Sequence, residues 1–337
     1  MGGMETYAKR LTEELAAFLS LEVVALRGRD DGRPPSIQAL LLFPFQVLRR
    51  WLALKQAPKI LHIGDMAIWP IGMLAWLARG RTKVILSAHG TDVSFPRRGG
   101  LKGSLYGAYL RFGASVFPNA RVLANSQATA AAVNAAGWKV GAVIPLGTDA
   151  AAQSVEGTHN GRILFAGRLV PLKGCSWFVE NVLPLLPPEI ELDVAGTIWD
   201  AQEGQILSQP RVNYLGYLKG PALAEAYRSA LCVILPNVAV ANGQFEGFGL
   251  VAIEAAAAGG VVLASNRDGL VDAVIDGRTG ILLPSGEPES WRDQIISLQN
   301  WRREERAEFA KESQKLIGLE FTWKRVATDT MKIYNAT

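Results

Sequence analysis

The sequence predicts an α/β protein with two doubly wound domains, each a parallel sheet that helices cover on both faces. Short apolar runs of strand type alternate with helix-like segments along the chain. The alternation stops at a polar, glycine-containing stretch at 153–161, which indicates a linker, and then starts again. A chain of 337 residues is long enough to give both domains a core.

The first half opens with a helical pattern whose apolar face carries Tyr7, Leu11, Leu15, Phe18 and Leu19. Strands are expected at 60–63, 84–87, 121–124 and 142–144. The segments between them, such as 128–136, have helical patterns. This order favours four parallel strands with helical crossovers.

The second half repeats this plan with strands expected at 163–166, 191–195, 212–215, 232–235, 261–264 and 281–283. Helices are expected at 173–186, 222–229, 250–258 and 288–298. A final helical piece has an apolar face made of Trp323, Val326, Ala327, Met331 and Tyr334. Doubly wound sheets bind ligands at the carboxyl ends of their strands, so we expect functional residues in the loops that follow them.

Cysteine and histidine usage limits the class of protein. Cys175 and Cys232 are the only cysteines, which favours a reducing compartment without disulfides. Neither they nor the three histidines have the spacing of metal ligands, and no Asp-x-Asp pair is present, so we expect no metal. Because the N-terminus has no apolar signal region and no apolar run has the length of a membrane span, we expect a cytoplasmic protein.

The charge is divided unevenly between the two halves. Residues 1–150 contain 18 Lys and Arg and 9 Asp and Glu, a net of +9, whereas residues 151–337 contain 17 and 22, a net of −5. A basic half attracts anionic partners. No nucleic-acid recognition motif accompanies it, so we expect no nucleic acid and favour peripheral contact with an anionic membrane.

The segment 36–56 mixes large apolar residues with Arg49, Arg50 and Lys55, and two interpretations of it stay open. A basic amphipathic helix can lie in a membrane interface. Alternatively, the segment is an ordinary domain helix whose apolar face packs on the sheet. Pro44 is expected to break the helical pattern.

The stretch QFEGFGLVAIEAAAAGG, at 244–260, carries the carboxylates Glu246 and Glu254, separated by seven residues. Gly247 and Gly249 let the main chain approach a ligand closely. The apolar run after them predicts a short buried helix, whose free N–H groups can bind a phosphate. The pattern indicates an enzyme that handles a nucleotide-activated sugar. The simpler alternative is a turn before a core helix, with Glu246 solvated and Glu254 paired to an arginine.

A second motif, AGRLVPLKG at 166–174, lies between a predicted strand and a predicted helix. Arg168 offers a planar set of donors and Lys173 a compact cation, and together they can neutralise a diphosphate leaving group. Taken alone, the motif is explained more simply by two solvated loop cations.

The two motifs together resemble those of the family 4 retaining glycosyltransferases. The first is similar to the E-x7-E signature of that family, and the second to its diphosphate-binding G-R-x-x-x-x-K-G element. The likeness extends from Gly2 to about Tyr334 and includes Gly280 and Pro284. It implies the GT-B fold, with two Rossmann-like domains and a central cleft. The implied parts are an acceptor-binding domain at 1–155, a nucleotide-sugar-binding domain at 156–318, and a helix at 319–337 that crosses back to the first domain.

The resemblance also assigns roles to single residues. It implies that Glu246 orients the sugar, that Glu254 binds the ribose, and that no metal is needed. The residues implied in catalysis are Glu246, His89, Arg168 and Lys173. The residues implied in donor binding are Gly3, Gly167, Arg168, Lys173, Gly196, Leu218, Phe248, Gly249, Leu250 and Glu254. For Gly196 and Leu218, a strand end followed by a turn is an equally good explanation.

His89 follows the strand predicted at 84–87, in the sequence AHGTD. A lone histidine in such a place is more often structural. The resemblance puts it beside the transferred sugar, where it would bond a hydroxyl or steady developing charge. Asp92 is a weaker candidate, because an aspartate in a loop often caps a turn.

The beginning of the chain departs from the family pattern. Family members open with an apolar strand before a Gly-Gly loop and a helix, whereas here Gly2 and Gly3 stand at the start. We therefore expect the first strand of the N-terminal domain to be absent, which would expose sheet edges and put activity in question. Residues 1–6 also match a myristoylation pattern, an alternative to the loop.

The sequence thus predicts a retaining, metal-independent glycosyltransferase without a cofactor. It would move a sugar from a UDP- or GDP-linked donor to a hydroxyl of a carbohydrate or lipid-linked acceptor, in polysaccharide, glycolipid or other glycoconjugate synthesis. It would work in the cytoplasm, peripheral at the inner face of the membrane. Two alternatives stay open: a nucleotide-sugar epimerase or hydrolase of the same fold, and a non-catalytic carbohydrate- or membrane-binding subunit.

Overall fold

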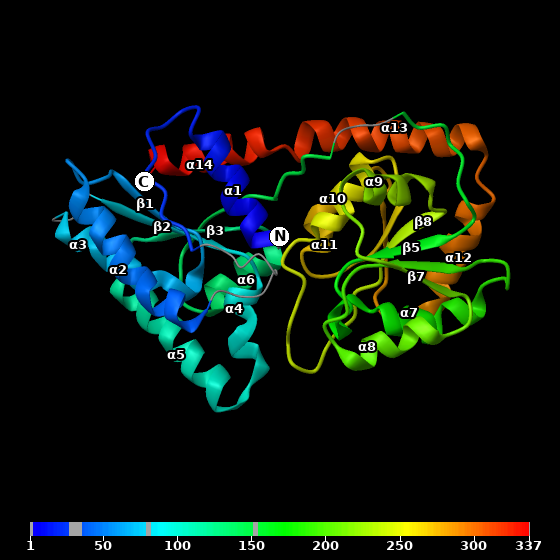
Figure 1. The fold of residues 1–337 in the computed structure, drawn as a ribbon, viewed down its shortest axis with the longest axis horizontal. Coiled ribbons are helices and arrows are strands. Elements are labelled where there is room, and N and C mark those ends of the chain that lie inside the picture. The colour runs from blue at the N-terminus through cyan, green and yellow to red at the C-terminus, as the bar shows by residue number, and fades with distance from the viewer. Residues whose placement is uncertain (1–2, 27–35, 79–81, 151–153, 337) are drawn as a thin grey trace. The chain divides into compact units, whose positions relative to one another are not determined.

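The computed structural model describes residues 3–26, 36–78, 82–150 and 154–336 (Figure 1). The chain forms two compact units. The first comprises Met1–Asn125, Thr129–Ile144 and Val326–Thr337, and the second comprises Ser126–Ala128 and Pro145–Arg325. The boundaries expected from the sequence at 155 and 318 therefore both fall inside the second unit.

The sheet of the first unit has four parallel strands in the order β1-β2-β3-β4. Their bounds are β1 (Ile60–Ile63), β2 (Lys83–Ala88), β3 (Arg121–Ala124) and β4 (Val140–Val143). The two central strands are buried, with Ile85, Leu86 and Val122 at 0% exposure. All four predicted strands are confirmed, because strands that are covered on both faces are apolar throughout.

The helical elements of the first unit are α1 (Gly3–Leu15), α2 (Ile37–Ala53), η1 (Met66–Met73), α3 (Leu74–Leu77), α4 (Thr91–Ser94), η2 (Phe95–Arg98), α5 (Gly100–Val116) and most of α6 (Gln127–Ala135) and α14 (Trp323–Ala336). A chain of hydrogen bonds joins α1 and α14 to the sheet. Tyr7 and His62 each bond the Ser87 hydroxyl at 2.8 Å, and His62 Nδ1 bonds the Tyr334 hydroxyl at 2.6 Å.

Two expectations for these helices are wrong. The apolar stripe of α1 ends with Leu15, and Phe18 lies beyond the helix with 55% of its surface exposed. Pro44 does not break the second helix, which continues through it from Ile37 to Ala53. Phe43 and Val47, before and after the proline, are both buried, and this packing outweighs the helix-breaking tendency of proline.

The sheet of the second unit has six parallel strands in the order β10-β9-β8-β5-β6-β7. Their bounds are β5 (Ile163–Ala166), β6 (Leu192–Ala195), β7 (Val212–Gly216), β8 (Cys232–Leu235), β9 (Val262–Ser265) and β10 (Ile281–Leu283). The chain builds outward from β5 through β6 to β7, and then returns to place β8 on the other side of β5. All six predicted strands are confirmed.

The helical elements of the second unit are η3 (Pro171–Lys173), α7 (Cys175–Asn181), η4 (Leu183–Leu185), α8 (Ala201–Gln205), η5 (Ile206–Ser208), α9 (Gly220–Ser229), α10 (Leu250–Ala257), α11 (Leu270–Ala273), α12 (Pro288–Gln299) and α13 (Arg303–Glu320). They cover a core in which Phe165, Phe178 and Trp291 are at most 1% exposed. Both units are therefore α/β layers around parallel sheets, the fold class that the sequence predicts.

The prediction of a single helix at 173–186 is wrong. The segment is divided into η3, the short α7 and η4. Gly174 has φ +69°, a left-handed conformation that separates η3 from α7. Pro184, near the start of η4, lacks the N–H that a continuous helix would need.

Candidate functional site

The strand order of the second unit reverses between β5 and β8, so the loops after these two strands leave the sheet in different directions. Such a switch point is where open α/β sheets bind their ligands. The loop after β5 carries Arg168 and Lys173, and the loop after β8 carries Asn237 and Glu246. The fold therefore brings together the two motifs that the sequence predicted as parts of one site.

Lys173 and Glu246 form an ion pair across this switch point, with both side chains 15% exposed. The Asn237 amide also donates to the Glu246 carboxylate, at 3.2 Å. Burial by itself raises the pKa of Glu246, but the charge and hydrogen bond of Lys173, the bond from Asn237 and the charge of Arg168 outweigh it, so the pKa lies below its ordinary value. Glu246 is therefore an ionised acceptor, and the expectation of a solvated Glu246 does not hold.

Arg168 is held beside an aromatic ring that the sequence analysis missed. The loops after β5 and β6 pair through Leu169 and Ile198, and this pairing brings Trp199 next to Arg168. The guanidinium carbon lies 5.0 Å from the centre of the Trp199 ring. Within the described parts of the chain, Arg168 has no carboxylate in ion-pair distance, so its charge is available to an anionic ligand.

The start of α10 lies at the same strand ends and carries no side-chain cap. Gly249 stands at the N-cap with φ +101°, a conformation that favours glycine. Phe248 before it is buried, and its ring lies 6.3 Å from that of Phe321. The backbone N–H groups around Leu250 therefore point out of a fixed helix start, where they can bind a phosphate.

Glu254 lies one helical turn inside α10 and is half-buried. Burial, and the nearby charge of Asp149, raise its pKa above the ordinary value. Among the described residues no hydrogen bond or ion pair is made by its carboxylate, so the alternative in which Glu254 pairs with an arginine is wrong. An unpartnered, half-buried carboxylate is well suited to accept hydrogen bonds from ligand hydroxyls.

Gly167 and Gly196, which were predicted to take part in donor binding, follow the adjacent strands β5 and β6. Gly167 N–H donates to the Ala195 carbonyl at 2.9 Å, and Gly196 N–H donates to the Gly216 carbonyl at 2.8 Å. A Cβ atom on Gly196 would lie 1.7 Å from the Gly167 carbonyl oxygen. Leu218 is half-buried in the loop between β7 and α9.

In the first unit, His89 directly follows β2 and is 8% exposed. Its Nε2 lies 2.9 Å from the Gly64 carbonyl oxygen, and its ring meets that of Tyr7 edge-on at 4.8 Å. Because a carbonyl only accepts, Nε2 carries the proton and Nδ1 keeps its lone pair. Burial lowers the pKa of His89, so the ring is a neutral hydrogen-bond acceptor. This state suits a bond from a sugar hydroxyl better than stabilisation of negative charge.

Two aspartates surround His89. Asp92 is buried and accepts from the backbone N–H groups of His89, at 2.9 Å, and Met66, at 3.3 Å, so it joins the loops after β1 and β2. Asp65 was missed by the sequence analysis. One of its oxygens caps η1 at the Ala67 N–H, at 2.6 Å, and burial together with Asp92 raises its pKa to about 6. The tripeptide Gly64-Asp65-Met66 after a strand carries no signal that would have identified Asp65.

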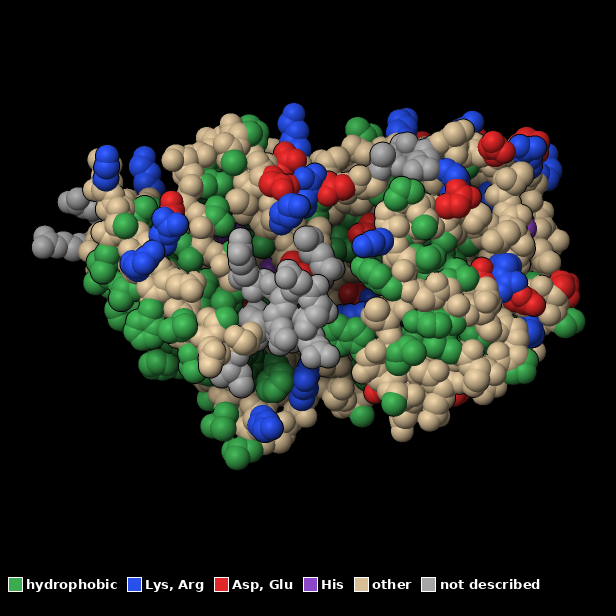
Figure 2. All heavy atoms as spheres, in the orientation of Figure 1, with side chains coloured by type: hydrophobic (Ala, Val, Ile, Leu, Met, Phe, Trp, Pro, Cys, Tyr) green, Lys and Arg blue, Asp and Glu red, His purple; other side chains and the backbone are tan. Residues whose placement is uncertain are grey.

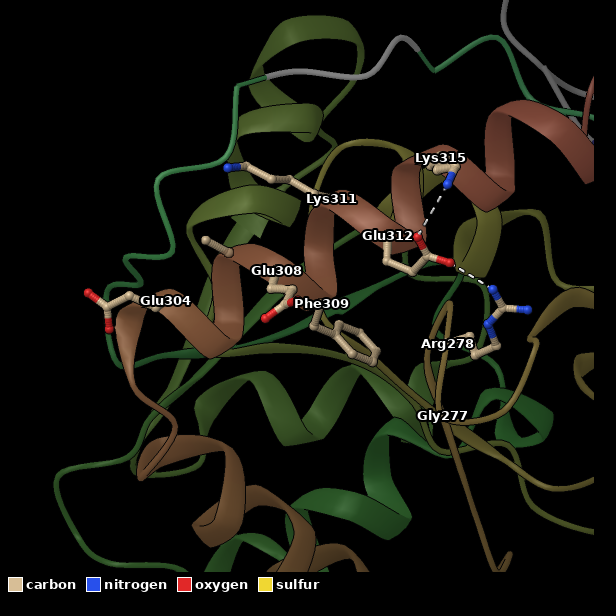
Figure 3. A pocket seen from close by; sticks show the side chains of 9 residues that line it. Gly277, Arg278, Glu304, Glu308, Phe309, Lys311, Glu312 and Lys315 are labelled. Atoms are coloured by element: carbon tan, nitrogen blue, oxygen red, sulfur yellow. Dashed lines mark hydrogen bonds and ion pairs between the residues drawn. The ribbon is translucent and has the colours of Figure 1, made fainter.

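Gly3 is the first residue of α1, whereas Met1 and Gly2, on which the myristoylation alternative depends, lie outside the described residues. The described residues hold no group of three His, Cys, Asp or Glu side chains arranged for a metal ion. A separate pocket lies along α13, lined by exposed charges such as Arg278 and Glu312, which pair at 2.7 Å (Figure 3). Paired surface charges of this kind are typical of a solvated helix flank.

Two parallel-sheet units, one with cationic and carboxylate loops at its switch point, define the GT-B class of glycosyltransferases. Solved structures agree on the fold. HepE of Anabaena, crystallised with UDP and glucose, is 18% identical, with a TM-score of 0.73 over 100% of this chain and 96% of that one. Sucrose-phosphate synthase of Thermosynechococcus elongatus is 20% identical, with a TM-score of 0.72 over 100% and 94%.

Family models match both halves of the chain. Residues 1–152 match the model described as Glycosyltransferase Family 4, and residues 160–300 match the model described as Glycosyl transferases group 1. The chain is therefore built from two glycosyltransferase domains, one of family 4 at 1–152 and one of group 1 at 160–300.

Curated relatives include several proteins named D-inositol 3-phosphate glycosyltransferase. That of Paenarthrobacter aurescens is 34% identical over 51% of this chain, which spans 43% of the relative's length. That of Saccharomonospora viridis is 25% identical over 99% of this chain and 89% of its own. The first of these similarities covers less than half of the relative.

Proposed function

We propose that the protein is a retaining glycosyltransferase, which moves a sugar from a nucleotide diphosphate to an acceptor hydroxyl. The observation that carries the proposal is the Lys173–Glu246 pair at the β5–β8 switch point, next to Arg168 and the uncapped start of α10. A site with cations, a helix start and two carboxylates offers partners to each part of a nucleotide sugar.

In the proposed arrangement, Arg168, Lys173 and the amides of 248–250 bind the diphosphate. The ionised Glu246 accepts bonds from sugar hydroxyls, and Glu254 accepts bonds from the ribose. The bond between the anomeric carbon and the phosphate oxygen breaks while the cations and the helix start stabilise charge on the departing diphosphate. The acceptor oxygen attacks the same face of an oxocarbenium-like sugar, and its proton leaves with the diphosphate. These residues supply the charge stabilisation without a metal.

The similarity to HepE, which was crystallised with UDP and with UDP-glucose, supports a UDP-linked donor, and GDP remains the second candidate. We propose that Nδ1 of His89 accepts a hydrogen bond from a hydroxyl of the transferred sugar. We further propose a carbohydrate or lipid-linked acceptor and a place of action in the cytoplasm, on the inner face of the membrane. None of the described helices combines the length and the apolar composition that a membrane crossing requires.

The substitution Glu246→Gln tests this function. It keeps the shape of the side chain but removes the charge that pairs with Lys173. We expect kcat/KM for transfer from UDP- or GDP-sugars to fall by about 100-fold or more, since loss of one preorganised electrostatic partner has effects of this size. The measurement is the release of nucleotide diphosphate in the presence of an acceptor, with radiolabelled sugar to follow the product.

Asp193→Asn is the matched control. Asp193 pairs with Arg162 at 2.7 Å and is 13% exposed, but it belongs to the amino-terminal half of β6, away from the switch-point loops. Its loss should affect stability and leave transfer within about threefold of wild type. Equal transfer by wild type and Glu246→Gln would refute the assignment. Complete turnover of the donor without any acceptor would instead favour the epimerase or hydrolase.

A further inference from the structure

The surplus positive charge of the first 150 residues comes from one segment, residues 36–116, which runs from the residue before α2 to the end of α5. It contains 11 Lys and Arg and 2 Asp, a net of +9, while the other residues of 1–150 contain 7 of each sign. The two aspartates are Asp65 and Asp92, which lie at the strand ends described above. The segment itself is therefore cationic, and an acid from outside it, Glu22, pairs with Arg50 of α2 at 3.6 Å.

The same segment exposes large apolar side chains. Of the 22 large hydrophobic residues that are exposed in the described parts of the chain, 11 belong to it. Eight of these are leucine or methionine. Figure 2 shows hydrophobic side chains gathered over the flank on which Figure 1 places α2, α3 and α5. Apolar surface of this extent on one flank marks an interaction site.

Helix α2 has two apolar faces. Phe43 and Val47 are buried against the unit, with exposures of 6% and 8%. A second stripe, Leu41, Phe45, Leu48 and Leu52, has the spacing of one helix face, and three of its members are 67–69% exposed. The structure therefore shows the packing that the second interpretation of 36–56 expects, and it leaves exposed a second apolar face that the membrane interpretation requires.

Helix α5 repeats this arrangement. Its inner face is packed closely, since a Cβ atom on Gly113 would lie 2.6 Å from the Trp138 ring. Its outer stripe, Leu101, Leu105, Ala108 and Phe112, has the same spacing as that of α2, and the three large residues are 61–76% exposed. The outer stripe of α5 therefore does not take part in the packing of the first unit.

Cations flank both stripes. By helical position, Arg49 lies at one side of the α2 stripe, and Lys102 and Arg111 lie on the two sides of the α5 stripe. Trp76 and Leu77 at the end of α3 add an exposed aromatic and an exposed aliphatic side chain, at 57% and 59%. Tryptophan, leucine stripes and flanking cations are the composition of helices that lie in an anionic lipid interface.

We propose that this flank, made of the outer faces of α2, α3 and α5, docks on an anionic lipid bilayer. The stripes would enter the interface between headgroups and acyl chains, and Arg49, Lys102 and Arg111 would contact the anionic headgroups. A second copy of the chain fits less well, because two flanks of the same positive charge repel each other. Nucleic acid would leave the aliphatic stripes in water. The proposal deepens the membrane contact proposed above and does not depend on sugar transfer.

Sedimentation of the full chain with vesicles tests the proposal. We expect binding to phosphatidylcholine vesicles that contain phosphatidylglycerol, weak binding to phosphatidylcholine alone, and a decrease with added salt. Phe45→Ser and Leu105→Ser should each lower the partition coefficient at least about tenfold, because each removes a large side chain from the interface. The control is Leu319→Ser on α13, an equally exposed leucine (62%) outside the flank, which should bind as wild type does.

Charge variants provide a second route that does not alter apolar surface. Arg49→Gln and Lys102→Gln should each weaken vesicle binding about fivefold, and Lys311→Gln on α13 should leave it unchanged. Wild-type binding by all four flank variants would overturn the proposal, as would failure of the wild type to bind anionic vesicles. A wild-type dimer that Phe45→Ser and Leu105→Ser turn into a monomer would assign the flank to a second copy. Nucleotide binding, measured in parallel, should be unchanged in every variant. A failure of the wild type to bind nucleotide would count against the proposed donor site and not against membrane docking.

Discussion

Arg168 and Trp199 form the contact at the proposed donor site that sequence patterns could not indicate. Sequence reasoning found Arg168 through its motif, but Trp199 lies 31 positions away, and only the pairing of Leu169 with Ile198 makes the two residues neighbours. The guanidinium 5.0 Å from the ring is held in place by about 0.5–1 kcal/mol, which a phosphate can readily exceed. A diphosphate should therefore draw Arg168 away from the ring.

This movement predicts a fluorescence signal. Titration with the nucleotide diphosphate that binds should change the tryptophan emission of the wild type, and Trp199→Phe should lose most of the change while its affinity shifts by less than about fivefold. Trp76→Phe, which removes another exposed tryptophan in the first unit, should keep the signal. An unaltered change in Trp199→Phe would show that the ring does not respond to the ligand.

The sequence did not predict which side chains of the site contact one another. Glu246 and Lys173 were both predicted at strand ends, but their direct pairing depends on the order in which β8 returns beside β5. The tautomer of His89 is likewise set by the Gly64 carbonyl, which belongs to the loop of a different strand. Contacts of this kind depend on tertiary structure, and no local pattern encodes them.

The strand–turn elements of the second unit depend on glycines for different reasons. A Cβ atom on Gly196 would meet the Gly167 carbonyl at 1.7 Å, whereas at Gly216, with φ +71°, the space around a Cβ atom is open. Gly196→Ala should therefore lower the free energy of unfolding by roughly 3 kcal/mol or more, because the backbone must move. Gly216→Ala carries only the conformational cost, on the order of 1 kcal/mol.

Urea unfolding, followed by far-UV circular dichroism, measures both substitutions. Gly196→Ala should also weaken nucleotide binding, because Gly167 and Gly196 stand beside the Arg168 loop. Equal stabilities of the two variants would contradict the close approach of the two strand ends.

The elements themselves were predictable to different degrees. The ten predicted strands are all present, because strands buried on both faces are short, apolar and bounded by polar loops. The helix at 173–186 failed since its apolar pattern continues through Gly174 and Pro184, which divide it into three pieces. The prediction at Pro44 was wrong in the opposite sense, since a helix break was expected there and none occurs. The packing of Phe43 and Val47 preserves α2 across the proline.

At the scale of the whole molecule, charge is divided by unit, and most of the exposed large apolar side chains of the described residues belong to the first unit. The cationic, apolar flank belongs to the first unit, and the switch-point site belongs to the second, whose residues carry the acidic surplus. The sequence predicted this division of charge and the α/β class of both units. It could not predict that α2 and α5 carry matching outer stripes. An apolar stripe can be recognised as exposed only when the structure shows which face of the helix packs on the unit.

The central claim is that the β5–β8 switch point of the second unit binds a nucleotide diphosphate. Isothermal titration of the full chain with UDP, GDP and ADP tests it most directly, with Lys173→Ala and the control Asp193→Asn beside the wild type. We predict that at least one of these nucleotides binds, that Lys173→Ala weakens this binding about tenfold or more, and that Asp193→Asn leaves it unchanged. Wild-type affinity in Lys173→Ala, or no binding of any of the three nucleotides, would contradict the account.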